Sequence, residues 1–231
     1  MPKAKPNVLF RGLRRMVLTF LVLALLLFAP AGSFRFWPAW AYILIMAVFW
    51  TFFSVDLYRR SPDLVERRLQ AKEPEHKQKL ILKIFSVFLY AGFILCGLDF
   101  RFGWSPQWIT RVPLGLMVAG QFGVIAGYLL VYWVMRTNAF AASIIRVEAG
   151  QRVIDTGPYA LVRHPMYTGM ALTALSTPLA LGSYVAVPIF AMIVPVLICR
   201  LQHEEKTLCR DLSGYTDYCI RTPFRLILWI W

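Results

Sequence analysis

Charged side chains are scarce in this sequence, and acidic ones are scarcest. Only 16% of the 231 residues are charged, against about 25% in an ordinary soluble domain, and 58% are hydrophobic. This composition argues against a soluble monomer. The 25 Lys and Arg outnumber the 12 Asp and Glu, and a net charge of +13 in a soluble chain would suggest a nucleic-acid partner. In a membrane protein the same excess sets the orientation of the helices, so the positions of the cations decide between the two interpretations.

Cysteine pairs of the metal-binding or redox kind are missing. The four cysteines stand at positions 96, 199, 209 and 219, and no two of them form a CxxC pair. A zinc or thioredoxin-type site therefore has no support, and we predict no metal site. The pattern favours free thiols in a reducing compartment.

Long apolar runs predict an all-α integral membrane protein, built as a bundle of five to six transmembrane helices. About 20 helical residues cross the hydrocarbon core, and runs near that length cover 16–31, 36–58, 80–98 and 112–135. The stretch 166–201 is too long for one crossing and has Gly182-Ser183 in its middle. It predicts a hairpin, with a short helix ending near Leu181 and a second helix from Ser183 to about Leu208. The first run could be a signal peptide, but its cleavage signal is weak and the next run follows at once, so we expect an uncleaved helix.

The cations segregate strongly once these spans are drawn. With the N-terminus inside, 22 of the 25 Lys and Arg fall on the inner side, which leaves only Arg35, Arg101 and Arg111 outside. This asymmetry is the positive-inside pattern, so the basicity indicates orientation and no nucleic-acid role is expected. Anionic lipid head groups are plausible partners for the loop between residues 59 and 79.

Local sequence patterns predict three further features of the bundle. Gly120, Gly123 and Gly127 form a stripe on the fourth span that would let another helix approach closely. Gln121, a polar group at lipid depth, is expected to face the bundle. The segment 224–231 alternates Leu and Ile with two Trp, is too short to span, and could lie at the inner interface.

A polar inner segment, residues 138–167, carries the first candidate chemistry. Gly157-Pro158 predicts a turn, and Pro165 is expected to begin the next helix. Arg163 and His164 then stand just before a helix N-terminus, whose free N–H groups and dipole favour an anion. We expect a carboxylate-sized site there. The alternative is structural: Arg163 reaches lipid phosphates and His164 caps the helix.

The inner end of the last long helix carries the second candidate group. Arg200 and Glu204 are four residues apart and share one helical face, whereas Glu205 points about 100° away. The hairpin that starts after His164 would return Glu204 to the membrane face that carries Arg163 and His164. An ordinary surface ion pair between Arg200 and Glu204 is the alternative.

These residues resemble a known superfamily. The RHPxYxG motif at residues 163–169, Glu204-Glu205 about 35 residues later, and the following Gly214-Tyr215-Thr216-Asp217-Tyr218 are similar to the isoprenylcysteine carboxyl methyltransferase and phospholipid methyltransferase superfamily. The resemblance covers roughly residues 138–225. It implies an integral membrane enzyme that uses S-adenosyl-L-methionine, with a catalytic region at 136–231 after four transmembrane helices at 1–135.

The resemblance also implies roles for individual residues. Arg200 would hold the methyl acceptor, and a cofactor pocket on the cytoplasmic side would be formed by Gln151, Arg152, Val153, Ile154, Tyr159, Arg163, His164, Pro165, Met166, Tyr167 and Glu204. Members that act on prenylcysteine have His where this chain has Gln151, so the acceptor need not be the same. No GxGxxG follows a strand, which excludes a soluble Rossmann-type site.

The predicted activity is methyl transfer to a lipophilic or lipidated acceptor at the cytoplasmic face, most like carboxyl methylation of prenylated cysteine. Arg200 would orient an acceptor carboxylate through its planar fork. A phospholipid amine acceptor would first have to lose a proton, and Glu205 or His203 would be the base. Two rivals remain: an NADPH-dependent enzyme like the sterol reductases, which carry a similar motif and a late Tyr-Cys, and a membrane scaffold or transporter.

Overall fold

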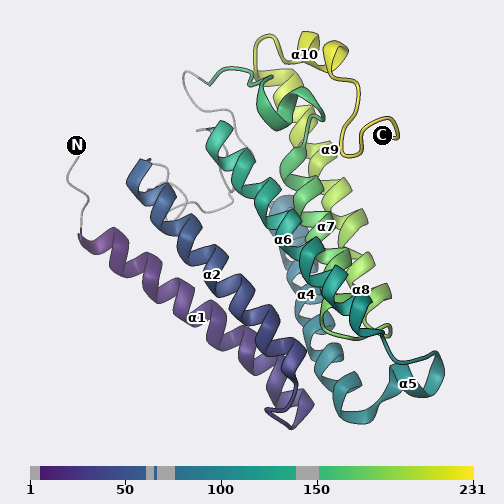
Figure 1. Ribbon diagram of the computed structural model, residues 1–231. Coiled ribbons are helices and arrows are strands. Elements are labelled where there is room, and N and C mark those ends of the chain that lie inside the picture. Colours follow the sequence, from purple (N-terminus) through teal and green to yellow (C-terminus); the bar gives the residue numbers. More distant parts are fainter. Residues whose placement is uncertain (1–5, 61–64, 67–75, 139–150) are drawn as a thin grey trace.

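The structure is a computed structural model, which describes residues 6–60, 65–66, 76–138 and 151–231. The regular elements in these ranges are all helical, as predicted (Figure 1). They are α1 (Pro6–Ala31), α2 (Trp37–Arg60), α4 (His76–Phe102), α5 (Trp104–Trp108), α6 (Leu114–Thr137), η1 (Gly157–Ala160), α7 (Pro165–Ala180), α8 (Val187–Ala191), α9 (Ile193–Asp211) and α10 (Tyr215–Arg221). Most of the predicted lipid-binding loop at 59–79, and the part of the polar segment from 139 to 150, lie outside the described residues.

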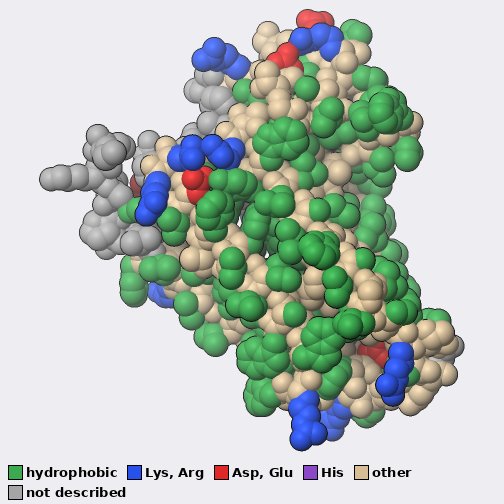
Figure 2. Space-filling model, viewed as in Figure 1, with side chains coloured by type: hydrophobic (Ala, Val, Ile, Leu, Met, Phe, Trp, Pro, Cys, Tyr) green, Lys and Arg blue, Asp and Glu red, His purple; other side chains and the backbone are tan. Residues whose placement is uncertain are grey.

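Five helical segments are long and apolar enough to cross a membrane, which confirms the integral membrane prediction. They are Phe10–Ala31, Trp37–Arg60, His76–Phe102, Leu114–Thr137 and Val187–Asp211, the last made of α8 and α9 together. Apolar side chains cover the flanks of the bundle, whereas Lys and Arg gather toward its two ends (Figure 2). Exposed residues such as Leu21, Leu44 and Phe122 lie on these flanks, where lipid tails would cover them.

The hairpin predicted over residues 166–201 differs from its prediction in the second arm. The first arm is the short helix α7, which ends at Ala180 as expected. The second arm is not one helix from Ser183: α8 and α9 are separated at Met192. Pro195 has no N–H to donate to the carbonyl of Ala191, so the helical ladder is interrupted there.

The glycine stripe on α6 is a packing surface, as predicted. A Cβ atom at Gly120 would lie 2.5 Å from the backbone nitrogen of Ala180, and one at Gly127 would lie 2.7 Å from the carbonyl oxygen of Gly169. Gln121 does face the bundle, since its Nε2 donates to the Ala180 carbonyl oxygen at 3.2 Å. The pairing of α6 with α7 is the most extensive between two elements, and it fixes the helix that carries the RHPxYxG motif.

A buried carboxylate that the sequence did not single out closes the opposite end of the bundle. Asp99, near the end of α4, is 3% exposed and accepts hydrogen bonds from the Ser105 backbone N–H at 2.7 Å and from the hydroxyls of Ser105 and Ser183. The Ser105 hydroxyl oxygen in turn accepts from the backbone N–H of Tyr184. This network ties α4 and α5 to the turn after α7, far from the motif end of the helices (Figure 1).

The elements of the candidate site meet at the other end, the upper end in Figure 1. The last turn of α6, the first turn of α7 and the last turns of α9 lie there, together with η1, α10 and the C-terminus. The helical bundle thus brings residues from the two inner segments of the second half of the chain to one place. The predicted division into 1–135 and 136–231 stays a prediction.

Candidate functional site

The motif folds as its prolines and glycine predict. Gly157 has a φ of +60°, which a residue with a side chain rarely adopts, and it begins the short turn η1. Pro165 is the first residue of α7, where its missing N–H costs nothing, and His164 is the N-cap. Arg163 and His164 therefore stand at the helix start as expected, and both are buried, at 8% and 4% exposure.

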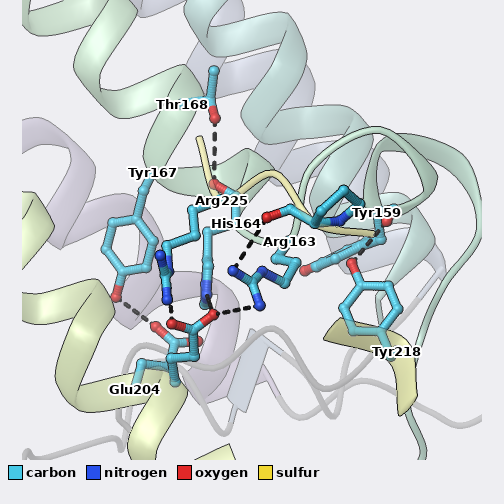
Figure 3. Close-up of polar contacts among 10 residues, drawn as sticks. Tyr159, Arg163, His164, Tyr167, Thr168, Glu204, Tyr218 and Arg225 are labelled. Atoms are coloured by element: carbon cyan, nitrogen blue, oxygen red, sulfur yellow. Dashed lines mark hydrogen bonds and ion pairs between the residues drawn. The ribbon is translucent and has the colours of Figure 1, made fainter. Parts of the chain in front are cut away.

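The carboxylate that faces Arg163 and His164 belongs to the chain itself. Oε1 of Glu205 lies 3.1 Å from Nη1 of Arg163 and 3.8 Å from Nε2 of His164, and Oε2 accepts a hydrogen bond from Nε of Arg225 at 2.8 Å (Figure 3). Glu205, rather than Glu204, meets Arg163 and His164 because Leu197, Leu201 and Glu205 form the buried stripe of α9. The carboxylate-sized site expected before α7 thus already holds an anion.

Glu204, the residue before Glu205 on α9, points about 100° away from it and lies beside the side chain of Tyr167. The Tyr167 hydroxyl donates to Oε2 of Glu204 at 2.6 Å, which joins α7 to α9 (Figure 3). Tyr167 is buried, whereas Glu204 is half-buried. The structure therefore brings Tyr167 and Glu204 together, two residues that the resemblance assigns to the cofactor.

Arg200 lies one turn before Glu204 and contacts a residue from the first half of the chain. Its Nη1 donates to Oε1 of Gln78 at 3.4 Å. Gln78 lies in the first turn of α4, is fully buried, and its Nε2 finds no hydrogen-bond partner among the described residues. We did not predict this residue, although a glutamine at the start of an apolar span was a signal that could have found it.

The C-terminal segment contributes residues that we did not predict. The backbone N–H groups of Arg163 and His164 donate to the carbonyl oxygens of Phe224 and Arg225, at 2.9 and 3.0 Å. The Thr168 hydroxyl donates to the Leu226 carbonyl oxygen at 2.7 Å (Figure 3). The backbone amides of the two residues just before α7 are therefore taken by this segment. In the sequence Arg225 is one basic residue among many inner-side cations, so no signal marked it.

Tyr159 and the strip before the motif pack against α10. The Tyr159 hydroxyl accepts a hydrogen bond from Nδ2 of Asn138 at 3.0 Å, and its carbonyl oxygen accepts from the Tyr218 hydroxyl at 2.7 Å. The pKa of Tyr159 is raised to about 12, mainly by burial; the hydrogen bond from Asn138 opposes this rise, and the nearby Glu204 adds to it. In the strip Gln151, Arg152, Val153 and Ile154, Arg152 is exposed and the others are half-buried; Val153 packs against the buried Tyr215 and Tyr218.

The remaining motif residues lie between helices. Pro165 is buried, and Met166 packs against Met135 near the end of α6. Among the described residues there is no group of three or more His, Cys, Asp or Glu that could hold a metal ion.

Comparison with known proteins gives a family for the second half of the chain. Residues 118–210 match the isoprenylcysteine carboxyl methyltransferase (ICMT) family. The structure also resembles that of a eukaryotic intramembrane Ras methyltransferase, ICMT, with a TM-score of 0.54 over 87% of this chain and 71% of that chain. At 17% sequence identity this likeness concerns the fold.

Other similar proteins have names that do not refer to methyl transfer. The nickel-cobalt-cadmium resistance protein NccN of Alcaligenes xylosoxydans xylosoxydans is 27% identical over 125 residues, which make up 52% of each chain. The Delta(14)-sterol reductase TM7SF2 of Mus musculus is 27% identical over 90 residues, 38% of this chain and 22% of the reductase. This chain thus spans about half the length of the first relative and about a fifth of the second. Residues 118–210 are thus similar to the isoprenylcysteine carboxyl methyltransferase family, and the helical fold of the chain resembles that of the eukaryotic ICMT.

Proposed function

We propose that this chain is a membrane methyltransferase that transfers a methyl group from S-adenosyl-L-methionine to the carboxylate of a lipophilic acceptor. The observation that carries the proposal is the convergence of Tyr167, Arg200 and Glu204 at one end of α7 and α9, inside the region that matches the family. A carboxylate, a phenol and a guanidinium thus lie together where α7 begins and toward the end of α9.

The residues present fit the amino-acid end of the cofactor, which carries an ammonium and a carboxylate. The half-buried carboxylate of Glu204 is suited to the ammonium. Nε of Arg163 and Nε2 of His164, both within the motif, are buried and have no hydrogen-bond partner among the described residues, so they can donate to an anion in addition to the Glu205 carboxylate beside them. We assign the holding role to these groups, together with Tyr159, Tyr167 and the 151–154 strip. When bound, the cofactor supplies an electrophilic methyl group on a sulfonium.

The protein's own contribution is alignment and exclusion of water. A methyl transfer needs donor and acceptor in line, and groups held by α7 and α9 can fix both. A carboxylate acceptor opposite a sulfonium loses charge in the transition state, so a dry site at the membrane boundary favours that step. Arg200, which donates to Gln78, would orient such a carboxylate through its planar guanidinium.

A carboxylate acceptor also suits the environment of Glu205. An amine acceptor needs a base to remove its proton, but both oxygens of Glu205 face cationic or imidazole groups. A carboxylate held in this way is a poor proton acceptor, whereas a carboxylate substrate needs no base. We therefore assign Glu205 a holding role within the site, which leaves His203 as the other candidate base, and we favour oxygen over nitrogen as the methylated atom. From the positive-inside pattern, we propose that this end of the bundle faces the cytoplasm.

A second candidate rests on the similarity to the sterol reductase over 90 residues. An enzyme of that kind would bind NADPH rather than S-adenosylmethionine. The two candidates share the motif and differ in the cofactor, so a binding measurement separates them.

The test is isothermal titration of the purified protein in detergent with S-adenosylhomocysteine and, separately, with NADPH. We expect the wild type to bind S-adenosylhomocysteine, and Glu204→Gln and His164→Ala to bind it at least about tenfold more weakly, since each removes one charged or polar contact. Asp211→Asn is the matched control, because it makes the same acid-to-amide change at an exposed position of α9. Equal binding by all four proteins would remove the site, and binding of NADPH alone would favour the reductase.

A further inference from the structure

The last nine residues of the chain, 223–231, form a tail that is bonded into the motif rather than lying loosely beside it. Three successive carbonyl oxygens of the tail, those of Phe224, Arg225 and Leu226, accept hydrogen bonds from Arg163, His164 and Thr168. Two of the donors are backbone amides and the third is a hydroxyl on the first turns of α7. The tail thus runs along the motif over its length (Figure 3).

The tail is also closed on itself, so its path is defined. The backbone N–H groups of Leu226 and Ile227 donate to the Trp231 carbonyl oxygen, at 2.8 and 3.1 Å. Leu226 is 6% exposed and packs in the main core cluster. Trp229 has a φ of +62°, the one described non-glycine residue with a positive φ, and marks the tight turn that this closure needs. A buried anchor and a closed turn hold Arg225 in place.

Arg225 is bonded to the motif in two ways. Its carbonyl oxygen accepts from the His164 N–H at 3.0 Å, and its Nε donates to Oε2 of Glu205 at 2.8 Å. The other oxygen of Glu205 faces Arg163 and the His164 imidazole. The guanidinium of Arg225 also lies over the Trp231 ring, 5.3 Å from its centre. Arg225, Glu205 and His164 therefore form a closed triangle that links the tail, α9 and the start of α7.

This arrangement gives each oxygen of Glu205 its own cationic partner. Without Arg225, Oε2 would lose its hydrogen bond and the carboxylate could rotate away from Arg163 and His164. Because those two residues precede α7 directly, such a rotation would loosen the first turn, which carries Tyr167.

We propose that Arg225 is a positioning residue for the cofactor site, acting through Glu205 on Arg163 and His164. The proposal rests on the proposed function, since it concerns the same site. Arg225 itself contacts neither Glu204 nor Tyr167 in the described contacts, and its effect is on the geometry of the motif.

Two measurements test this role, and the first does not depend on the function. Amide hydrogen exchange of the purified protein in detergent is followed in peptides that cover residues 159–180. In Arg225→Met we expect faster exchange of the Arg163 and His164 amides, because their acceptors are tail carbonyls, with unchanged exchange in the second half of α7. Arg225→Lys keeps the charge and should restore most of the protection. Arg210→Met is the control, an exposed arginine bonded to the adjacent Asp211.

The second measurement is the affinity for S-adenosylhomocysteine, with the KM for S-adenosylmethionine where turnover is seen. We expect about tenfold weaker binding and a higher KM in Arg225→Met, with kcat less affected, and nearly normal values in Arg225→Lys and Arg210→Met. Mere loss of folded protein would lower the active fraction and leave KM unchanged.

The outcomes separate the two proposals. No binding of S-adenosylhomocysteine by the wild type would overturn the proposed function, and the exchange data would still judge the tail. Unchanged exchange in Arg225→Met, or normal affinity in that variant while the wild type binds, would overturn the positioning role. A lysine variant as impaired as the methionine variant would also contradict it, because the charge would then not be what matters.

Discussion

Neighbouring glutamates on α9 should respond very differently to the same substitution. Glu205 is the shared partner of Arg163 and Arg225, whereas Glu204 receives one hydroxyl hydrogen bond from Tyr167. Glu205→Gln and Glu204→Gln both replace an acid by its isosteric amide, one position apart. We expect the first to destabilise the fold strongly and the second only slightly.

The size of the difference follows from burial. The side chains of Glu205 and Arg163 are 11% and 8% exposed, and that of Arg225 is 36% exposed. Removing one partner of a buried ion pair leaves an uncompensated charge and typically costs about 3–5 kcal/mol. Since Arg225 is partly solvated, the lower part of that range, about 3 kcal/mol, is the better expectation for Glu205→Gln. In Glu204→Gln the amide oxygen still accepts from Tyr167, so the loss should be about 1 kcal/mol.

Thermal unfolding in detergent, followed by circular dichroism, measures both variants against the wild type. For a chain of this length, about 3 kcal/mol corresponds to a fall in Tm of roughly 6–12 °C, and about 1 kcal/mol to roughly 2–4 °C. The affinity for S-adenosylhomocysteine should respond in the opposite order. Glu204→Gln should weaken binding more directly than Glu205→Gln, since Glu204 is the residue proposed to touch the cofactor. Equal small shifts in Tm for the two variants would refute the central place of Glu205 in the fold of the site.

Three further predictions concern other contacts of the described residues. Gly120→Ala should lower the Tm in detergent by several degrees because its Cβ would clash with the α7 backbone, whereas Gly115→Ala, with nothing within 4 Å, should not; equal Tm values would contradict the close packing. The pKa of Tyr159 is raised to about 12, so its contribution to stability is present below its unfolded pKa of about 10 and is lost as the pH rises toward 12. The Tyr159→Phe variant should therefore lose less stability than the wild type between these two pH values. An alkaline unfolding profile that is the same in both proteins would count against the burial of the phenol. Gln78→Leu should raise the KM for the acceptor with little effect on S-adenosylhomocysteine binding, since Gln78 contacts Arg200; loss of cofactor binding alone would argue that the pair serves the cofactor instead.

The spans were predictable because each long helix is apolar along a length that matches the bilayer. The starts of α6 and α7 were equally clear, because a proline marks the beginning of each helix. The break at Met192 was harder to see, since Pro195 lies three positions farther on and the hydropathy runs through it. The short helices α5 and α10 carry no long apolar pattern, so their formation depends on tertiary contacts.

The candidate site was predictable in its members but not in its pairings. RHPxYxG and the two glutamates mark the residues, but which glutamate meets Arg163 depends on the rotation of α9 about its own axis. That rotation is set by the buried stripe of Leu197, Leu201 and Glu205. A charged residue is not expected in an apolar stripe, so the burial of Glu205 could not be predicted from the sequence. The contribution of Arg225 was invisible, because it depends on the tail folding back over α7, a long-range contact with no local pattern.

The most direct test of the central claim is methyl transfer itself. The purified protein in lipid is given S-adenosylmethionine with a labelled methyl group and an S-prenylated cysteine derivative whose amine is blocked, and the product is treated with base. A methyl ester is hydrolysed by base and releases volatile labelled methanol, whereas a methylated amine keeps its label. We predict base-labile label that depends on the protein and is lost in Glu204→Gln and in Arg200→Met. A parallel assay uses a prenylated acceptor with a free amine, and base-resistant label on that acceptor alone would contradict carboxyl methylation. No transfer to either acceptor by a protein that binds NADPH would contradict the account as a whole.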